Sequence, residues 1–356
     1  MTVNLDDAPL YPTFDPDNML KTIQELPRQV REAWAVTQEA PLPDAYRGID
    51  HIAVGGMGGS AIGGDLLKGL VERRGTVPLE VVRGYDLPAY LEGERMLFVA
   101  SSKSGNTEET LSLLDQALER GMRVVAVTTG GKIAEKAQER DLPLWSFEYD
   151  ATPRASIGYS LTLLAGLASR LGVLPDVESA VDETVEALQG LQSKLLPQVE
   201  MGDNPAKDLA RKLEGKLPFI FGSGFLTAVA RRWKTQMNEN AKQWAGWDEL
   251  PELNHNTVVG FGLPESVVPH LVVLFLRSNL DHPRVKVRWE VTQDLLTKNN
   301  VLAYEIHGRG ESPLSQLLTL IHFGDFVSYY VTALNGVDPT PVENIDYLKE
   351  RLAEVE

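Results

Sequence analysis

The sequence has no cysteine among its 356 residues. This absence excludes a disulfide framework, a thiolate metal site and a cysteine nucleophile. We find no run of about 20 consecutive apolar residues, the length that a membrane-spanning helix needs. The first residues lack the basic and then apolar segments of an export signal. We therefore expect a cytoplasmic protein that does not enter a membrane.

Positive charge is scarce, because 34 Lys and Arg residues stand against 50 Asp and Glu residues, a net charge of −16. Such a chain repels polyanions, which argues against nucleic acid as the main partner. A single phosphate group is not excluded, since backbone N–H groups at a helix start can bind one. The six histidines include no pair at i, i+4 spacing, so no helical metal site is indicated.

Apolar segments alternate with helical patterns through two cycles of the chain. The expected strands cover 52–54, 79–82, 96–100 and 124–127, and then 217–221, 271–276 and 301–306. Helical patterns cover 19–37, 66–72 and 314–334, and two more, with polar faces, cover 153–171 and 177–196. Strands that alternate with helices of this length indicate an α/β fold built on parallel sheets.

The cycle is duplicated. Glycine turns at Gly55 and Gly222 each close the first strand of a cycle, and the distance between them is about the length of one domain. We expect a helical lead-in over 1–46, a first subdomain over 47–197 and a second subdomain with C-terminal helices over 198–356.

The first glycine turn, GGMGGSAIGG over 55–64, surrounds Ser60 and allows close approach of a ligand or of another backbone. A dinucleotide fingerprint is only weakly matched, because no acidic residue ends the next strand, and the lysine of a P-loop is absent. The hypothesis of an NAD-dependent oxidoreductase would rest on these glycines alone. The other interpretation is a tight strand-to-helix turn with packing glycines.

Hydroxyl groups gather after the strand at 96–100, at Ser102, Ser104 and Thr107, with Lys103 among them. Several hydroxyl donors at a helix N-terminus suit a phosphate monoester. The competing interpretation is ordinary helix capping, in which Asn106 and Glu109 form a capping box. Three hydroxyl residues exceed what capping requires, which favours phosphate.

Two ordered sets of motifs carry a resemblance to a known family. GMGGSAIGGDL followed by SGNTEETL resembles the sugar isomerase (SIS) domain family, and ENAK followed by LPELNHN and GVDPTPVENIDYLK resembles its bifunctional phosphoglucose/phosphomannose isomerase branch. The resemblance implies two SIS-type subdomains, each a parallel sheet flanked by helices in three α-β-α layers. It implies interconversion of glucose 6-phosphate or mannose 6-phosphate with fructose 6-phosphate, without a metal or other cofactor, in a homodimer.

The resemblance also assigns roles to residues. It gives phosphate contacts to Ser102, Ser104 and Thr107, and it places the backbone of Gly59 and Ser60 beside the sugar. The four residues that it implies for the chemistry are Arg154, Glu239, His255 and Lys349, with His255 contributed across the dimer interface. The sequence differs from the family pattern at Lys103, at Thr257 and in the text QWAGWDEL after ENAK.

Aldose-ketose isomerisation moves a proton between C2 and C1 through a cis-enediol, and it requires one carboxylate base. Glu239 suits this base, and His255 can take and return a proton during ring opening. Arg154 can stabilise enediolate oxygens as a fork-shaped donor. On residues alone, Glu239 and Lys349 would each be a charge on a solvated helix face, and Arg154 could equally be a surface arginine.

The sequence therefore predicts a hexose-6-phosphate isomerase with Glu239 as base. The alternative is a catalytically silent SIS module that senses a sugar phosphate and regulates a partner. Such a module would use the same segment with Ser102, Ser104 and Thr107, here called the serine loop.

Overall fold

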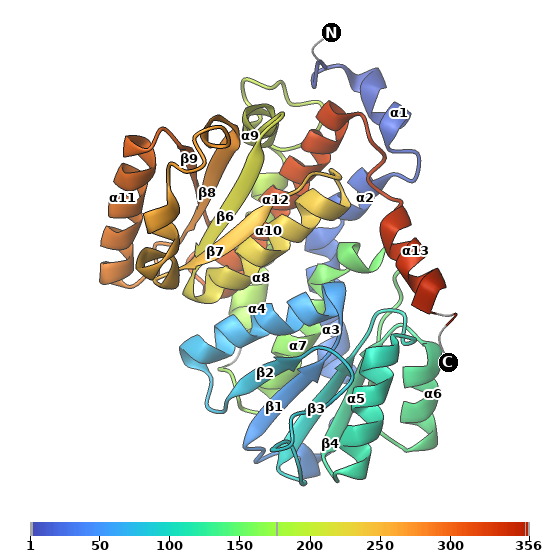
Figure 1. Ribbon diagram of the computed structural model, residues 1–356. Coiled ribbons are helices and arrows are strands. Elements are labelled where there is room, and N and C mark those ends of the chain that lie inside the picture. Colours follow the sequence, from blue (N-terminus) through green and yellow to red (C-terminus); the bar gives the residue numbers. More distant parts are fainter. Residues whose placement is uncertain (1–2, 176, 353, 355–356) are drawn as a thin grey trace.

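The computed structural model describes residues 3–175, 177–352 and 354, and two parallel sheets dominate it (Figure 1). The first sheet has the strand order β2-β1-β3-β4-β5. Its strands are β1 (His51–Gly55), β2 (Leu79–Val82), β3 (Met96–Ser101), β4 (Arg123–Thr128) and β5 (Leu144–Ser146). Its central strands β1, β3 and β4 are almost wholly buried, which explains why they are near-continuous apolar runs.

The second sheet repeats this topology with the order β7-β6-β8-β9. Its strands are β6 (Leu217–Ser223), β7 (Gly246–Leu250), β8 (Leu271–Arg277) and β9 (Leu302–His307). The chain therefore visits β6, β7, β8 and β9 in the same spatial order as β1, β2, β3 and β4. The duplication that the two glycine turns predict is present in the strand order.

Helices cover both faces of each sheet, which gives the three α-β-α layers. The helices before residue 198 are α1 (Tyr11–Phe14), α2 (Met19–Gln24), α3 (Leu26–Glu39), α4 (Gly58–Arg74), α5 (Glu108–Glu119), α6 (Gly131–Glu139), α7 (Ile157–Arg170) and α8 (Glu178–Gln192). Those after it are α9 (Pro205–Leu213), α10 (Thr227–Glu239), α11 (Pro283–Lys298), α12 (Pro313–Asn335) and α13 (Glu343–Leu352). Helices α5 and α6 cover the outer face of the first sheet and α11 that of the second (Figure 1).

A shared layer of helices lies between the two sheets and contains the largest core cluster. Helix α12 packs there against α8, α9 and α10, and α4 packs against α7 and α10. By length and composition α12 could cross a membrane, but 94% of its most apolar stretch is buried in the fold, as expected of a core helix. The two halves consequently share one interior.

Three details differ from the expectations. Strands β5 and β7 carry no apolar run long enough to predict them; β7 reads GWDEL, and only its last residue is buried. Helix α4 already begins at Gly58, inside the glycine segment. The polar face predicted for 153–171 is wrong, because every residue of α7 from Ile157 to Ala168 is buried. The hydroxyl residues of α7 pack between neighbouring helices instead of facing water.

Candidate active site

The loop between β3 and α5 holds the predicted phosphate-binding residues. Ser102 is buried, and its hydroxyl lies 2.9 Å from the Thr107 hydroxyl and accepts a hydrogen bond from the Gly105 N–H at 3.2 Å. Ser104 is exposed. Thr107 is the N-cap of α5, and within the described structure no side chain caps this helix. The first-turn N–H groups of α5 are therefore open to an anion.

Asn106 does not form the capping box that the alternative interpretation expects. Its Oδ1 accepts a hydrogen bond from the Lys132 N–H at 3.1 Å, so it satisfies the start of α6 instead. Gly105 has φ +68°, and a Cβ built there would lie 1.7 Å from the Gly130 carbonyl oxygen. The contact between the β3–α5 and β4–α6 loops thus fixes the shape of the serine loop, and glycine is required at its tip.

The start of α4 lies against this loop and against η3 (Pro153–Ala155). The Ser60 hydroxyl accepts a hydrogen bond from the Lys103 N–H at 3.3 Å. A Cβ on Gly59 would lie 2.8 Å from the Pro153 carbonyl oxygen, so only glycine permits this approach. The glycines further along α4, such as Gly63 against Ser160, have the packing role.

Arg154 follows in η3 and is only 6% exposed, so the surface-arginine interpretation is wrong. Its Nε donates to Asn240 Oδ1 at 2.9 Å, and one Nη atom donates to the carbonyls of Pro339 and Thr340 at 2.6 and 2.9 Å. The other Nη atom faces Glu239 Oε2 at 3.7 Å. Burial lowers the pKa of this guanidinium, and the Glu239 carboxylate opposes that effect. One Nη group is therefore left facing the predicted base.

Glu239 is the last residue of α10, and its side chain is 30% exposed. It lines a cavity of about 520 Å³ together with Lys242, Asp338 and the residues that lead into α13. A buried network connects α10 with α12 and η3. Arg232 of α10 pairs with Asp325 of α12 and donates to the Arg154 carbonyl at 3.1 Å. The site therefore combines an accessible carboxylate with a rigid, buried cation.

His255 and Lys349 are not brought to Glu239 within one chain. His255 ends η5 (Glu252–His255) and is exposed. In the register of β6 and β7, Leu250 lies opposite Ser223, so η5 lies at the end of the sheet where α10 begins. Helix α10 has 13 residues and is about 20 Å long. Lys349 is 70% exposed and pairs with Asp346 at 3.4 Å.

The corresponding junction of the second sheet, between β8 and α11, is already filled. The Asp281 carboxylate accepts hydrogen bonds from the Ser223 hydroxyl at 2.9 Å, from Trp289 Nε1 at 3.1 Å and from the Ser278 N–H at 3.3 Å. His282 caps α11 through its Nδ1. The open helix start of α5 has no equivalent here.

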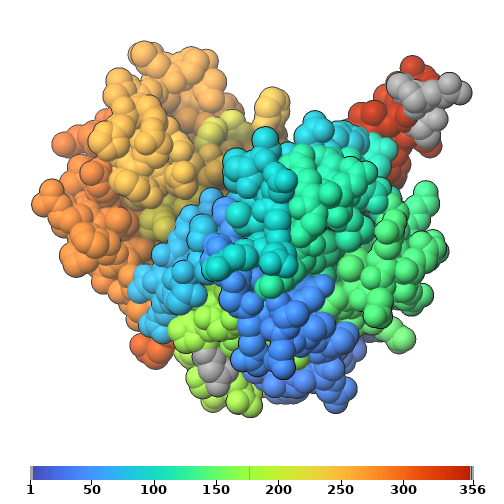
Figure 2. Space-filling model, turned by 90° about the horizontal axis from the view of Figure 1, so that it is seen from below, coloured from blue at the N-terminus to red at the C-terminus, as the bar shows by residue number. Residues whose placement is uncertain are grey.

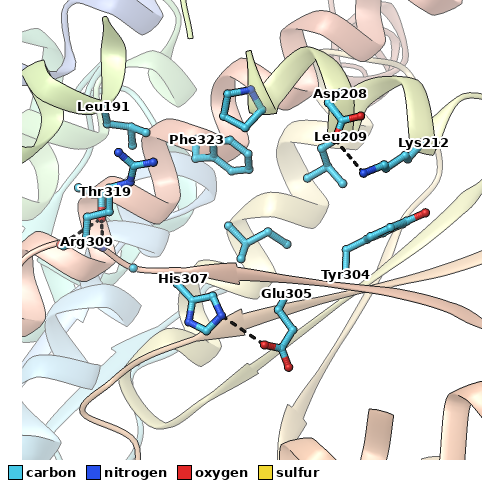
Figure 3. A pocket seen from close by; sticks show the side chains of 13 residues that line it. Leu191, Asp208, Leu209, Lys212, Tyr304, Glu305, His307, Arg309, Thr319 and Phe323 are labelled. Carbon is cyan, nitrogen blue, oxygen red and sulfur yellow. Dashed lines mark hydrogen bonds and ion pairs between the residues drawn. The ribbon is translucent and has the colours of Figure 1, made fainter. Parts of the chain in front are cut away.

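A second cavity, of about 400 Å³, lies between α9, β9 and α12 (Figure 3). Lys212 lies over the Tyr304 ring there, at 4.8 Å from its centroid, and pairs with Asp208 at 2.7 Å. None of the site residues predicted from the sequence lines it. The candidate active site is therefore the region between the serine loop, η3 and the end of α10.

Comparison with known proteins agrees with this fold. Residues 202–352 match the family model described as bacterial phospho-glucose isomerase C-terminal SIS domain. The chain is 38% identical to a bifunctional phosphoglucose/phosphomannose isomerase of Caldicellulosiruptor bescii over 95% of this chain and 99% of that protein. It is 35% identical to the protein of the same name from Aquifex aeolicus over 86% of this chain and 91% of that protein. The chain belongs to the bifunctional phosphoglucose/phosphomannose isomerase family.

The fold is also found among solved structures. The crystal structure of a hypothetical protein from Thermus thermophilus superposes with a TM-score of 0.75 at 15% identity, covering 98% of this chain and 93% of that one. The two proteins therefore share a fold over nearly the whole of this chain.

Sequence reasoning missed three contributors to the site: Asn240, Lys242 and the 338–341 segment. Asn240 and Lys242 belong to the ENAK motif, and the segment belongs to GVDPTPV, so the signal was present in motifs already quoted. Their contacts are with backbone carbonyls or with a buried guanidinium. Such partners are not visible in a linear sequence.

Proposed function

We propose that the protein interconverts glucose 6-phosphate and mannose 6-phosphate with fructose 6-phosphate through a cis-enediol intermediate. The observation that carries this proposal is the position of Glu239, a carboxylate that lines a cavity beside the buried guanidinium of Arg154. In this mechanism Glu239 moves the proton between C2 and C1. Arg154 directs its unused Nη group at the developing enediolate oxygen.

The substrate phosphate binds at the start of α5 in this proposal. Ser104 and Thr107 donate hydroxyl hydrogen bonds, and the open N–H groups of the helix add the positive end of its dipole. Buried Ser102 supports Thr107 at 2.9 Å. The backbone of Gly59 and Ser60 lies beside the sugar, next to the same loop.

We propose that the active form is a homodimer and that His255 reaches the site of the neighbouring subunit, where it assists ring opening. The length of α10 between His255 and Glu239 within one chain supports this arrangement. Lys349, on α13, assists in the same reaction. The division into 1–46, 47–197 and 198–356 and a cytoplasmic location belong to the same proposal.

The proposed function is tested by assaying both aldose phosphates with a coupled detection of fructose 6-phosphate, in the presence of a metal chelator. Turnover of both substrates is expected, because proton transfer through a carboxylate supplies the required chemistry. A protein that binds hexose 6-phosphates without turnover would instead be the non-catalytic sensor.

Glu239→Gln keeps the shape of the base and removes its basicity. General-base catalysis contributes about 10² to 10⁴-fold in rate, so we expect a fall of that size in kcat for both substrates. Hydrogen exchange with solvent at C2 should be lost as well. Glu214→Gln is the matched control, since Glu214 pairs with Arg211 on the surface at 2.8 Å. Full activity of Glu239→Gln would contradict its role as base and favour the interpretation of Glu239 as a charge on a solvated helix face.

A further inference from the structure

Lys242 has a backbone conformation that its residue type rarely adopts. It follows the end of α10 with φ +52°, in the left-handed region that favours glycine or asparagine. The position therefore does not favour lysine through its backbone. The presence of lysine at this position must therefore be explained by the contacts of its side chain.

The ammonium group of Lys242 meets three carbonyl oxygens. It donates to Glu239 at 2.5 Å, to Pro341 at 2.7 Å and to Pro339 at 3.2 Å. An ammonium has three N–H donors, so these bonds use its full capacity. The Glu239 carbonyl also lies at the negative end of the α10 dipole, where a cation is favoured. Lys242 is consequently occupied as a structural cation and has no proton to spare for the substrate.

Arg154 binds the same segment, because it donates to the carbonyls of Pro339 and Thr340. Three consecutive carbonyls, 339–341, thus bind two cations that both adjoin the Glu239 carboxylate or its backbone. Burial and the nearby Arg154 charge lower the pKa of Lys242, while Asp338, Glu239 and Glu343 oppose these effects. The segment is held by polar bonds to the groups that surround the base.

Pro339 itself is buried, but the chain that follows it, from 341 onward, is mostly exposed. Residues 337, 338 and 341–345 line the cavity that Glu239 faces, and they lead directly into α13. None of the residues described in α13 is buried. Figure 2 shows the red C-terminal helix standing out from the body of the molecule. Apolar packing therefore contributes little to the position of the chain from 341 onward.

We propose that Lys242 is a positioning residue for the isomerase reaction. It fixes the 339–341 segment, whose flanking residues line the cavity that Glu239 faces, and it thereby sets the approach of α13. The proposal rests on the function proposed above. It deepens that function by adding a residue that acts through the segment and does not touch the substrate.

Three substitutions separate this role from simple helix capping. Lys242→Met removes the ammonium and keeps the length of the side chain. Lys242→Gly also removes the ammonium, but it suits the left-handed backbone, so it keeps the fold. Lys242→Arg retains a cation with several donors. Lys216→Met is the matched control, because Lys216 donates to the Pro269 carbonyl at 2.8 Å on the exposed surface.

The measurements are kcat and KM for glucose 6-phosphate, affinity for a hexitol 6-phosphate, which has no carbonyl to isomerise, and amide hydrogen exchange of residues 338–352 without ligand. Lys242→Met and Lys242→Gly should lower kcat at least tenfold and change KM and hexitol phosphate affinity less than threefold. Exchange over 338–352 should become at least tenfold faster. Lys242→Arg should recover at least a third of kcat, and Lys216→Met should match wild type.

Unchanged kcat in an active protein would overturn the positioning role and leave the proposed function intact. Unchanged exchange over 338–352 would overturn the role of Lys242 in holding the segment. A wild-type protein without isomerase activity would contradict the proposed function itself, and with it the role of Lys242 in that reaction.

Discussion

At the scale of single residues, the serine loop contains one hydroxyl residue that maintains the loop and another that is open to a ligand. Ser102 is buried and bonded within the loop. Ser104 is exposed, and among the described residues its hydroxyl acts only as an acceptor, from the Asn106 N–H at 3.3 Å. Its hydroxyl proton is available for a ligand. A substitution at Ser104 should therefore report on phosphate binding, and one at Ser102 on the loop itself.

Ser104→Ala should weaken binding of a hexose 6-phosphate. A hydrogen bond to a charged group is worth about 1.5 to 3 kcal/mol, or about 10- to 150-fold in affinity. Calorimetric titration with a hexitol 6-phosphate measures the loss, and Thr107→Ala should behave in the same direction. Ser193→Ala is the control, because the Ser193 hydroxyl donates to the Gly190 carbonyl away from the site. Wild-type affinity in both loop variants would contradict the phosphate assignment.

At this scale the chemistry requires a carboxylate base, but only the resemblance to a known family singled out Glu239 and Arg154. On residues alone, each could have been a charge on the surface. The structure places the two side chains 3.7 Å apart. The bonds of Arg154 to Pro339 and Thr340 could not be predicted, since they join residues 185 and 186 positions apart through backbone atoms. Backbone acceptors have no signature in the sequence.

At the scale of elements, small residues allow α4 and α7 to pack closely. A Cβ on Gly63 would lie 2.1 Å from the Ser160 hydroxyl and 3.0 Å from its Cβ. Gly63→Ala should therefore lower the free energy of unfolding by about 1 to 3 kcal/mol through overpacking. Urea denaturation measures the change.

Gly190→Ala is the matched control for this prediction. Gly190 lies in α8, is exposed and has no atom within 4 Å of a built Cβ. Alanine there should stabilise the protein by up to about 1 kcal/mol, because glycine is the weaker helix former. Equal effects of the two substitutions would contradict the close packing of α4 on α7.

Helix α12 carries a buried histidine that should make stability depend on pH. His322 is fully buried, and one ring nitrogen lies 3.1 Å from Gln192 Oε1. Burial lowers the pKa of His322 to about 3. The folded value lies below the unfolded value near 6.5, so the unfolded chain takes up a proton first. Stability from neutral His322 is present above pH 6.5 and is lost as the pH falls toward 3.

Each pH unit within this window costs at most about 1.4 kcal/mol, or about 2 kcal/mol between pH 6.5 and 5. His322→Gln should flatten the dependence of unfolding free energy on pH by about this amount relative to wild type. Parallel curves for His322→Gln and wild type would contradict the prediction.

Elements were predicted best where burial leaves an apolar run, as in β1, β3 and β8. Strand β7 was missed because its charged residues face partly outward, and β5 because it has three residues. The burial of α7 was missed because Ser160 and Thr162 look polar in the sequence, although both are enclosed by neighbouring helices. Local composition describes a residue type but not its surroundings.

At the scale of the whole molecule, the duplication was visible in the sequence because both glycine turns follow a first strand. The proposed homodimer, by contrast, has no signature in a single chain. Helix α10 separates His255 from Glu239 within one subunit, so a shared site predicts complementation between inactive subunits.

Mixing His255→Ala subunits with Glu239→Gln subunits should restore activity, because one of the two sites in a heterodimer then holds both intact groups. The assay uses purified heterodimers carrying two different affinity tags. Homodimers of each variant, carried through the same exchange procedure, serve as controls. If demonstrated heterodimers remain as inactive as the parents, the site is not shared, although the isomerase function would still stand.

Asp281 makes the two halves of the duplicated fold unequal, and this difference predicts the number of substrate molecules that bind. Its carboxylate holds the Ser223 hydroxyl, the Trp289 indole and a backbone N–H at the second junction, where α5 leaves its donors open in the first. The second half therefore carries a permanent, covalently attached anion, and a sugar phosphate would have to displace a ligand whose effective concentration never falls. A chain with two equivalent folds should thus saturate with one equivalent of substrate, and a dimer with two.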